Sequence, residues 1–241
     1  MPAFEAGRRL SPGERVTLAG SESAHHITEV LRVRSGDRIT LFHDGTLYDA
    51  VVSDASRSSL AATVVAARPA PFVDRPIALL QAVIRPGLLD DVVHGCSPLG
   101  VSPFVFYAAE RSQPWNAAGR VERLGQVALA AVEQAETGRR PTVELVADLE
   151  RALARVDRAW RMLYFSPRAP LTVSALMRKG LLSLDSPIAM VVGPEGGFTV
   201  GEEALLEARK AVPVRLNTGI LRSELAGFAA ALIIRELQGP S

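Results

Sequence analysis

Val191-Val192-Gly193-Pro194-Glu195-Gly196-Gly197-Phe198-Thr199 is the stretch that decides the fold, because an apolar strand runs there directly into a glycine-rich loop. A second apolar strand runs into Asn217-Thr218-Gly219-Ile220-Leu221-Arg222-Ser223-Glu224. Ligands of open α/β sheets bind beyond the carboxyl ends of the strands, and glycine lets the backbone approach them closely. The two loops therefore predict one ligand pocket that is built largely of backbone.

The first loop has a simpler interpretation when it is taken alone, as an ordinary turn between a strand and a helix. Thr199 and Glu202 form a capping-box pattern, which places the start of the helix just after the loop. Pro194 and Glu195 interrupt the glycine spacing of a dinucleotide fingerprint, and the lysine and hydroxyl of a phosphate loop are missing. The loop therefore disfavours a dinucleotide or a nucleoside triphosphate as the ligand.

The second loop carries two charged residues, Arg222 and Glu224, at the start of the last predicted helix. Arg222 is either a surface arginine or a contact to a phosphate or an electron-rich base. Glu224 has a plain explanation in the helix dipole, which favours an acidic residue in the first turn.

The segment from residue 77 onward alternates apolar strands with amphipathic helices, which predicts an α/β layer fold with a mostly parallel sheet. The first strand of this segment is apolar almost throughout, as expected of a strand that is buried on both faces. Predicted strands cover 77–84, 104–109, 143–146, 161–165, 188–192 and 212–216, and predicted helices cover 88–99, 121–136, 149–155, 201–211 and 224–237.

The preceding segment predicts a small β-barrel with a single short helix at 24–31. Strands are expected at 38–43, 47–52 and 60–66, and Asp44-Gly45 is a strong hairpin signal between the first two. Prolines 69, 71 and 76 mark a linker. We therefore expect a β-barrel domain over 1–70, a linker over 71–76 and an α/β domain over 77–241.

Composition narrows the class of protein. The formal net charge is +1, so the chain lacks the global basic character of many nucleic-acid binders, although a local basic patch is compatible with that total. The single cysteine, Cys96, excludes an internal disulfide and a multi-cysteine zinc site. Neither a signal-peptide pattern nor a membrane-spanning apolar run is evident. We expect a soluble cytoplasmic protein with no metal and no membrane partner.

Together these motifs resemble the RsmE family of small-subunit ribosomal RNA methyltransferases, which belong to the SPOUT class with a trefoil knot. The resemblance depends mainly on the two loops and is strengthened by marks that occur in the family's order along nearly the whole chain. These marks are Ala24-His25-His26 to Val30-Leu31-Arg32, Gly36-Asp37, Glu110-Arg111-Ser112 and Glu133-Gln134.

The resemblance implies an N-terminal PUA-like barrel that helps to hold RNA and a knotted C-terminal domain that binds S-adenosylmethionine. It implies a homodimer that methylates N3 of one uridine in 16S rRNA, either free or in the small ribosomal subunit. Cofactor contacts are expected from Gly193, Pro194, Glu195, Gly196, Gly197, Leu216, Asn217, Gly219, Ile220 and Leu221. Arg222 is expected to stabilise the uracil or its phosphate, with Glu224 as its orienting partner, and RNA contacts are expected from Arg8, Arg9, His25, Arg32, Arg34 and Arg111.

The sequence also departs from the family. A helical run like Glu-Lys-Ala-Thr-Glu-Leu-Gly is usual where this chain has His94-Gly95-Cys96-Ser97-Pro98-Leu99-Gly100. Three charged positions are lost, and Pro98 is expected to shorten the helix. This departure leaves a second hypothesis open, a non-catalytic RNA-binding or ribosome-assembly protein that keeps the knotted fold.

Overall fold

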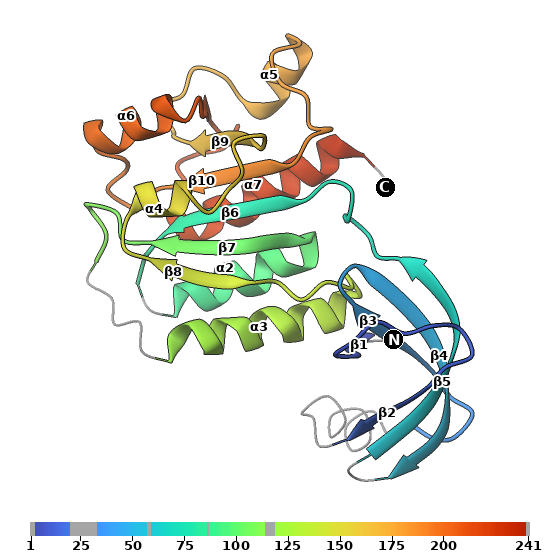
Figure 1. Cartoon of the computed structure of the whole chain (residues 1–241). Helices are drawn as coiled ribbons and strands as arrows, with labels where there is room; N and C mark the ends of the chain where they lie inside the picture. The colour runs from blue at the N-terminus through green and yellow to red at the C-terminus, as the bar shows by residue number, and fades with distance from the viewer. Residues whose placement is uncertain (1–2, 20–32, 57–58, 86, 114–118, 240–241) are drawn as a thin grey trace. The chain divides into compact units, whose positions relative to one another are not determined.

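The computed structural model describes residues 3–19, 33–56, 59–85, 87–113 and 119–239. The chain divides into two compact units (Figure 1). One comprises residues 1–73 together with 130–140, and the other comprises 74–129 together with 141–241. The predicted helix at 24–31 lies outside the described residues.

The N-terminal unit is built on a five-stranded sheet with the order β1-β3-β4-β5-β2. Only the β1–β3 pair is parallel, and the other pairs are antiparallel. Shifts of register in β4, between Asp49 and Ala50 and between Val52 and Asp54, are irregularities of the kind that bend a strand and curl a sheet. The five strands are Ala3–Glu5 (β1), Arg15–Ala19 (β2), Arg38–His43 (β3), Thr46–Ser56 (β4) and Ser59–Pro69 (β5).

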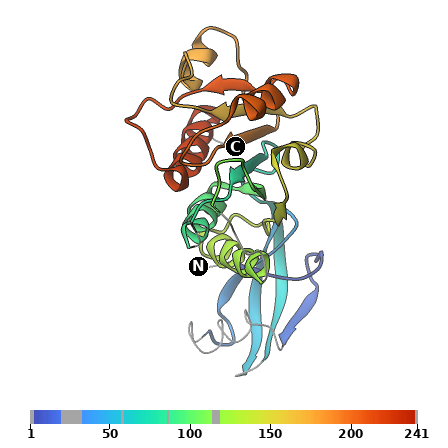
Figure 2. The same ribbon diagram turned by 90° about the vertical axis from the view of Figure 1, so that its left-hand side faces the viewer.

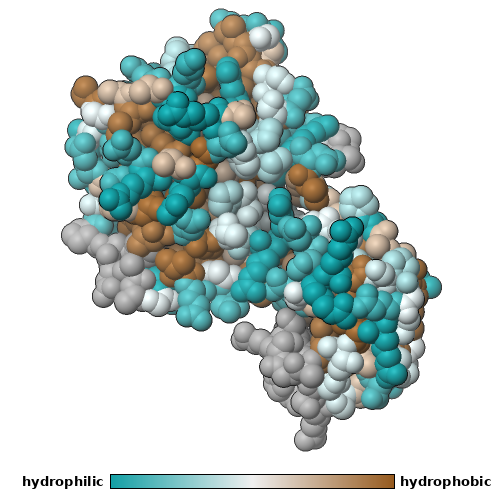
Figure 3. All heavy atoms as spheres, viewed as in Figure 1, coloured by the Kyte–Doolittle hydropathy of each residue, from teal (hydrophilic) through white to brown (hydrophobic). Residues whose placement is uncertain are grey.

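The hairpin between β3 and β4 turns where the sequence predicts. Asp44 and Gly45 both have positive φ angles, 39° and 80°, as a two-residue hairpin turn requires. Phe4, Leu41, Tyr48 and Leu60 are buried between the curled strands. Teal and white spheres, which mark hydrophilic and weakly polar residues, prevail on this unit in Figure 3.

The C-terminal unit contains a six-stranded sheet with the order β11-β9-β10-β6-β7-β8. Every neighbouring pair is parallel, so the predicted mostly parallel sheet is parallel throughout. Its strands are Ile77–Ala82 (β6), Val101–Tyr107 (β7), Val143–Val146 (β8), Arg161–Phe165 (β9), Ile188–Val192 (β10) and Val212–Val214 (β11).

Helices cover both faces of this sheet (Figure 2). Leu79, Phe104 and Phe106 pack on one face in a cluster that includes residues of α2, α3 and α7, and Leu80, Val105 and Tyr107 pack on the other face with α4 and α6. Burial on both faces explains the near-continuous apolar character of these strands. The helices are Leu88–Cys96 (α2), Arg120–Ala135 (α3), Leu149–Leu153 (α4), Val173–Arg178 (α5), Val200–Ala208 (α6) and Ser223–Gln238 (α7).

The segment that departs from the family pattern ends α2 early, as predicted. The α-helix stops at Cys96, and Ser97–Leu99 forms a single 3₁₀ turn. Pro98 has no N–H for an α-helical hydrogen bond, and Gly100 then closes the turn with a left-handed conformation.

Candidate cofactor and RNA-methylation site

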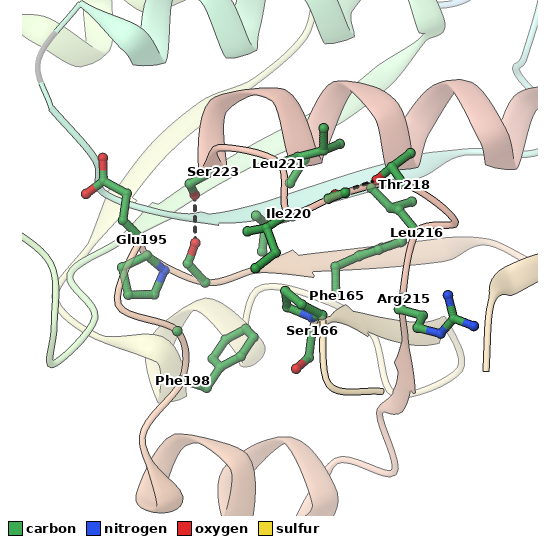
Figure 4. Close-up of a pocket in the computed structure, with 17 residues that line it drawn as sticks. Phe165, Ser166, Glu195, Phe198, Arg215, Leu216, Thr218, Ile220, Leu221 and Ser223 are labelled. Atoms are coloured by element: carbon green, nitrogen blue, oxygen red, sulfur yellow. Dashed lines mark hydrogen bonds between the residues drawn. The ribbon is translucent and has the colours of Figure 1, made fainter. Parts of the chain in front are cut away.

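The two glycine-bearing loops enclose one cavity at the carboxyl edge of the parallel sheet (Figure 4). The loops follow β10 and β11, which are the two neighbours of β9, and the segment after β9 forms the third wall. The cavity has a volume of about 350 Å³, which lies in the range of small-molecule sites. The predicted single pocket between the loops is therefore present.

Most of the residues predicted to bind the cofactor line this cavity, and two do not. Gly193, Pro194, Glu195, Gly197, Leu216, Gly219, Ile220 and Leu221 are lining residues. Gly196 and Asn217 belong to the same loops without lining the cavity.

The sequence interpretation missed a third wall, formed by Phe165, Ser166 and Pro167 at the end of β9. It also missed Phe198, Arg215, Thr218 and Ser223 within or next to the two loops. The signal for the third wall was available, because the predicted strand at 161–165 also ends at the carboxyl edge of the sheet. Its position between β10 and β11 could not be read from the sequence.

The ring of Phe198 lines the cavity and accounts for the presence of a glycine at position 193. A Cβ atom added to Gly193 would lie 3.1–3.3 Å from three carbons of the Phe198 ring, closer than ordinary contact. The ring is held in turn by Tyr164, at a centroid distance of 5.7 Å in an edge-to-face arrangement. A side chain at position 193 would therefore require the Phe198 ring to shift, whereas Gly197 has a positive φ of 70° that favours glycine.

Charge is confined to the two ends of the cavity. Figure 4 shows Glu195 at one end and Arg215 at the other, with Phe165, Leu216, Ile220 and Leu221 between them. Ile220 is 88% exposed although it is apolar. An apolar centre with backbone polar groups and separated charges suits a nucleoside that carries a zwitterionic tail.

The corner after β7 holds the glycine-rich loop in place through Glu110 and Arg111. The hydroxyl of Thr199 donates to Glu110 Oε1 at 3.0 Å, and Arg111 Nη1 donates to the carbonyl of Gly196 at 2.8 Å. The buried carboxylate of Glu202 accepts from the backbone N–H groups of both Glu110 and Thr199. Thr199 and Glu202 also complete the predicted capping box, with both of its hydrogen bonds.

Tyr107, at the end of β7, holds the end of β10 through a side-chain hydrogen bond. Its hydroxyl donates to the carbonyl of Val192 at 3.0 Å. Burial, reinforced by the Glu202 carboxylate, raises the pKa of the Tyr107 hydroxyl well above its usual value. The hydroxyl therefore remains a hydrogen-bond donor at any physiological pH.

Arg222 and Glu224 lie beside the cavity and do not line it. Arg222 Nη1 is 4.0 Å from Glu224 Oε1, and the two side chains are 79% and 9% exposed. Glu224 is thus fixed in the protein while the guanidinium group projects into solvent. The exposed guanidinium is therefore accessible to a ligand outside the cavity.

The structure describes four of the six residues predicted to contact RNA, which are Arg8, Arg9, Arg34 and Arg111. Arg8 pairs with Glu14, and the backbone N–H of Arg34 donates to Asp37 in a turn. Arg9 is exposed, and Arg111 braces the cofactor loop. His25 and Arg32 lie outside the described residues.

Two other features bear on the site. Burial raises the pKa of the Cys96 thiol to about 12, so this thiol is not a nucleophile at neutral pH. Among the residues that the structure describes, no group of three or more histidine, cysteine or acidic side chains could hold a metal ion, and no helix is long and apolar enough to cross a bilayer.

Comparison with known families agrees with this architecture. Residues 73–235 match the model of the RNA methyltransferase domain, and residues 18–65 match that of the RNA methyltransferase PUA domain. The chain belongs to the RsmE family of RNA methyltransferases. The predicted α/β fold with an N-terminal PUA-like sheet is confirmed.

Relatives extend over nearly the whole chain. Ribosomal RNA small subunit methyltransferase E of Rickettsia conorii is 28% identical over 95% of this chain and 93% of its own length. The enzyme of the same name from Neisseria gonorrhoeae, solved with S-adenosyl methionine bound, has a TM-score of 0.85 and 26% identity over 98% of both chains. A putative methyltransferase of Legionella pneumophila shares the fold, with a TM-score of 0.78 and 21% identity over 98% of this chain and 97% of its own.

Proposed function

We propose that this protein transfers the methyl group of S-adenosylmethionine to N3 of a uridine in the 16S RNA of the small ribosomal subunit. The observation that carries the proposal is the cavity between the loops at 193–198 and 215–221. The family of the chain and the cofactor bound by its Neisseria relative support it.

The residues that line the cavity match the chemical groups of S-adenosylmethionine. The apolar side chains of Phe165, Leu216 and Leu221 can enclose the adenine ring, and the backbone polar groups of Gly193, Gly197 and Ile220 can bind its edge and the ribose. Glu195 and Arg215, at the two ends, can each pair with a charge of the methionine tail.

When it is bound, S-adenosylmethionine supplies an electrophilic methyl group on a sulfonium. Methyl transfer would join uracil N3 to that carbon as the carbon–sulfur bond breaks, with the electron pair left on the sulfur and the N3 proton released to water. The loops around the cavity then contribute mainly by holding the reacting atoms in line. Because N3 also loses a proton, negative charge develops on the uracil, and the exposed guanidinium of Arg222 is suited to stabilise it.

The transfer itself is tested with labelled S-adenosylmethionine and small-subunit particles that lack the modification. We expect label in 16S RNA, recovered as N3-methyluridine after digestion and mass spectrometry. Large-subunit particles serve as the control and should remain unlabelled. Cofactor binding without transfer to particles or to free 16S RNA would contradict the proposal and favour a non-catalytic assembly protein.

We also propose that residues 1–70 hold RNA and that residues 71–76 connect them to the enzyme domain at 77–241.

A further proposal concerns assembly, and it is that two copies of the chain pair through α7. Leu225, Phe228 and Leu232 are 51%, 37% and 40% exposed and recur at helical spacing, so they form one apolar stripe. In a two-fold dimer the same stripe meets its own copy, which buries it on both chains.

Replacing Phe228 by aspartate is expected to convert the dimer to a monomer, because a charge would be buried at the centre of the stripe. The molar mass measured by light scattering after size exclusion should fall by half. Val200→Asp is the matched control, since Val200 is 86% exposed and belongs to α6. A native mass equal to one chain, or an unchanged mass for Phe228→Asp, would refute dimerisation through α7.

A further inference from the structure

We propose that Ser223 and Gln81 are positioning residues that bind the two walls of the cofactor cavity together. The inference rests on the proposed function, because it assigns these residues a role in binding S-adenosylmethionine. Neither residue was expected to act there from the sequence.

Three groups form a continuous hydrogen-bonded chain beneath the cavity. Gln81 Nε2 donates to Ser223 Oγ at 2.9 Å, and Ser223 Oγ donates to the carbonyl of Gly193 at 2.7 Å. The second of these bonds is drawn in Figure 4. Gln81 and Ser223 are 0% and 6% exposed, so water does not compete strongly for these bonds.

The Ser223 hydroxyl joins elements that are distant in the sequence. Ser223 is the first residue of α7 and lines the cavity directly after the second loop. Gly193 opens the first loop at the end of β10. One hydroxyl therefore fixes the first loop relative to the second. Since Tyr107 holds the neighbouring carbonyl of Val192, two successive peptide groups at this point are fixed by side chains.

Gln81 is present for its donor group and not for packing. Its Oε1 atom is buried without a partner among the described residues, which is unfavourable and would not occur with a leucine of similar size. The absence of a side chain at Gly227 lets α7 approach it, because a Cβ there would lie 3.2 Å from Leu79 and 3.3 Å from Gln81 Oε1. The close approach keeps the Gln81 amide within reach of Ser223.

The test compares Ser223→Ala with Ser97→Ala. Ser97 is also fully buried, and its hydroxyl also donates to a backbone carbonyl, that of Val93 at 2.7 Å, but it belongs to the turn after α2. We expect Ser223→Ala to weaken S-adenosylmethionine binding about tenfold by calorimetry, because the cofactor must then order the loops that this bond holds in the free protein, and Ser97→Ala to leave it unchanged. Ser223→Thr, which keeps the hydroxyl, should bind like the native protein, and Gln81→Leu should show a smaller loss.

A second readout does not depend on the cofactor. In the ligand-free protein, amide hydrogen exchange at 195–198 and 219–222 should accelerate together in Ser223→Ala and not in Ser97→Ala. Equal exchange in both variants would overturn the positioning role. If the native protein failed to bind S-adenosylmethionine, the proposed function would fall, while the exchange comparison would still decide whether the two loops are joined through Ser223.

Discussion

Replacing Arg222 by alanine is expected to lower kcat for methyl transfer by about 100- to 1,000-fold, the typical cost of removing one group that stabilises developing charge. Affinity for S-adenosylmethionine should stay the same, because Arg222 does not line the cavity and its side chain is 79% exposed. Single-turnover kinetics with small-subunit particles measure the rate of methyl transfer, and calorimetry measures the affinity for S-adenosylmethionine, so the two effects are separated.

Arg178→Ala is the matched control for Arg222→Ala, since Arg178 is an exposed arginine in the last turn of α5. It should leave both parameters unchanged. A loss of cofactor affinity in Arg222→Ala, or full activity without the guanidinium, would contradict the role assigned to this residue.

Replacing Gly193 by valine is expected to weaken S-adenosylmethionine binding by roughly 100-fold, which corresponds to the 2–3 kcal/mol typical of severe overpacking. Even a Cβ at this position would lie within 3.3 Å of three carbons of Phe198. The ring would have to move toward the cavity, or the loop would have to leave β10, and either change distorts the cofactor wall. Equilibrium dialysis with labelled cofactor measures the loss.

Gly125→Val is the control, because it separates the local effect at Gly193 from the effect that a glycine-to-valine change has on cofactor affinity elsewhere in the protein. Gly125 lies in α3, and nothing is within 4 Å of a Cβ built there. That variant should bind the cofactor like the native protein. Native affinity in a folded Gly193→Val protein would show that the wall at Gly193 does not contact the ligand.

The strands of the sheet were predictable because burial on both faces leaves a strong apolar signal. The predicted strands at 143–146, 161–165 and 188–192 agree with β8, β9 and β10. The strand predicted at 212–216 is shorter, because pairing with β9 stops at Val214 and residues 215 and 216 turn into the cavity wall. The short helix α5 was missed, although Thr172 caps it with a hydrogen bond to the N–H of Ala175.

The order of the strands was not predictable from periodicity, because it depends on pairings between distant segments. β10 lies between β6 and β9, and β11 lies outside β9. Phe165 and Ser166 therefore reach the cavity although no motif marks them. The glycine loops, in contrast, were predictable because a positive φ or a close backbone approach restricts the residue type.

The role of Arg111 shows where sequence and structure diverge in detail. Its motif, Glu110-Arg111-Ser112, was singled out from the sequence, and Arg111 was predicted to contact RNA. The structure shows its guanidinium donating a hydrogen bond to the carbonyl of Gly196, so Arg111 supports the glycine-rich loop. Only the fold brings the end of β7 next to the loop after β10.

The central claim, that the loops at 193–198 and 215–221 enclose S-adenosylmethionine, is tested most directly by a crystal structure of the protein with the cofactor. We predict electron density for the adenosine between Phe165, Gly193 and Ile220. Density at another place, such as the separate cavity of about 400 Å³ lined by Val83, Ser112 and Leu145 at the ends of β6 to β8, would contradict the account.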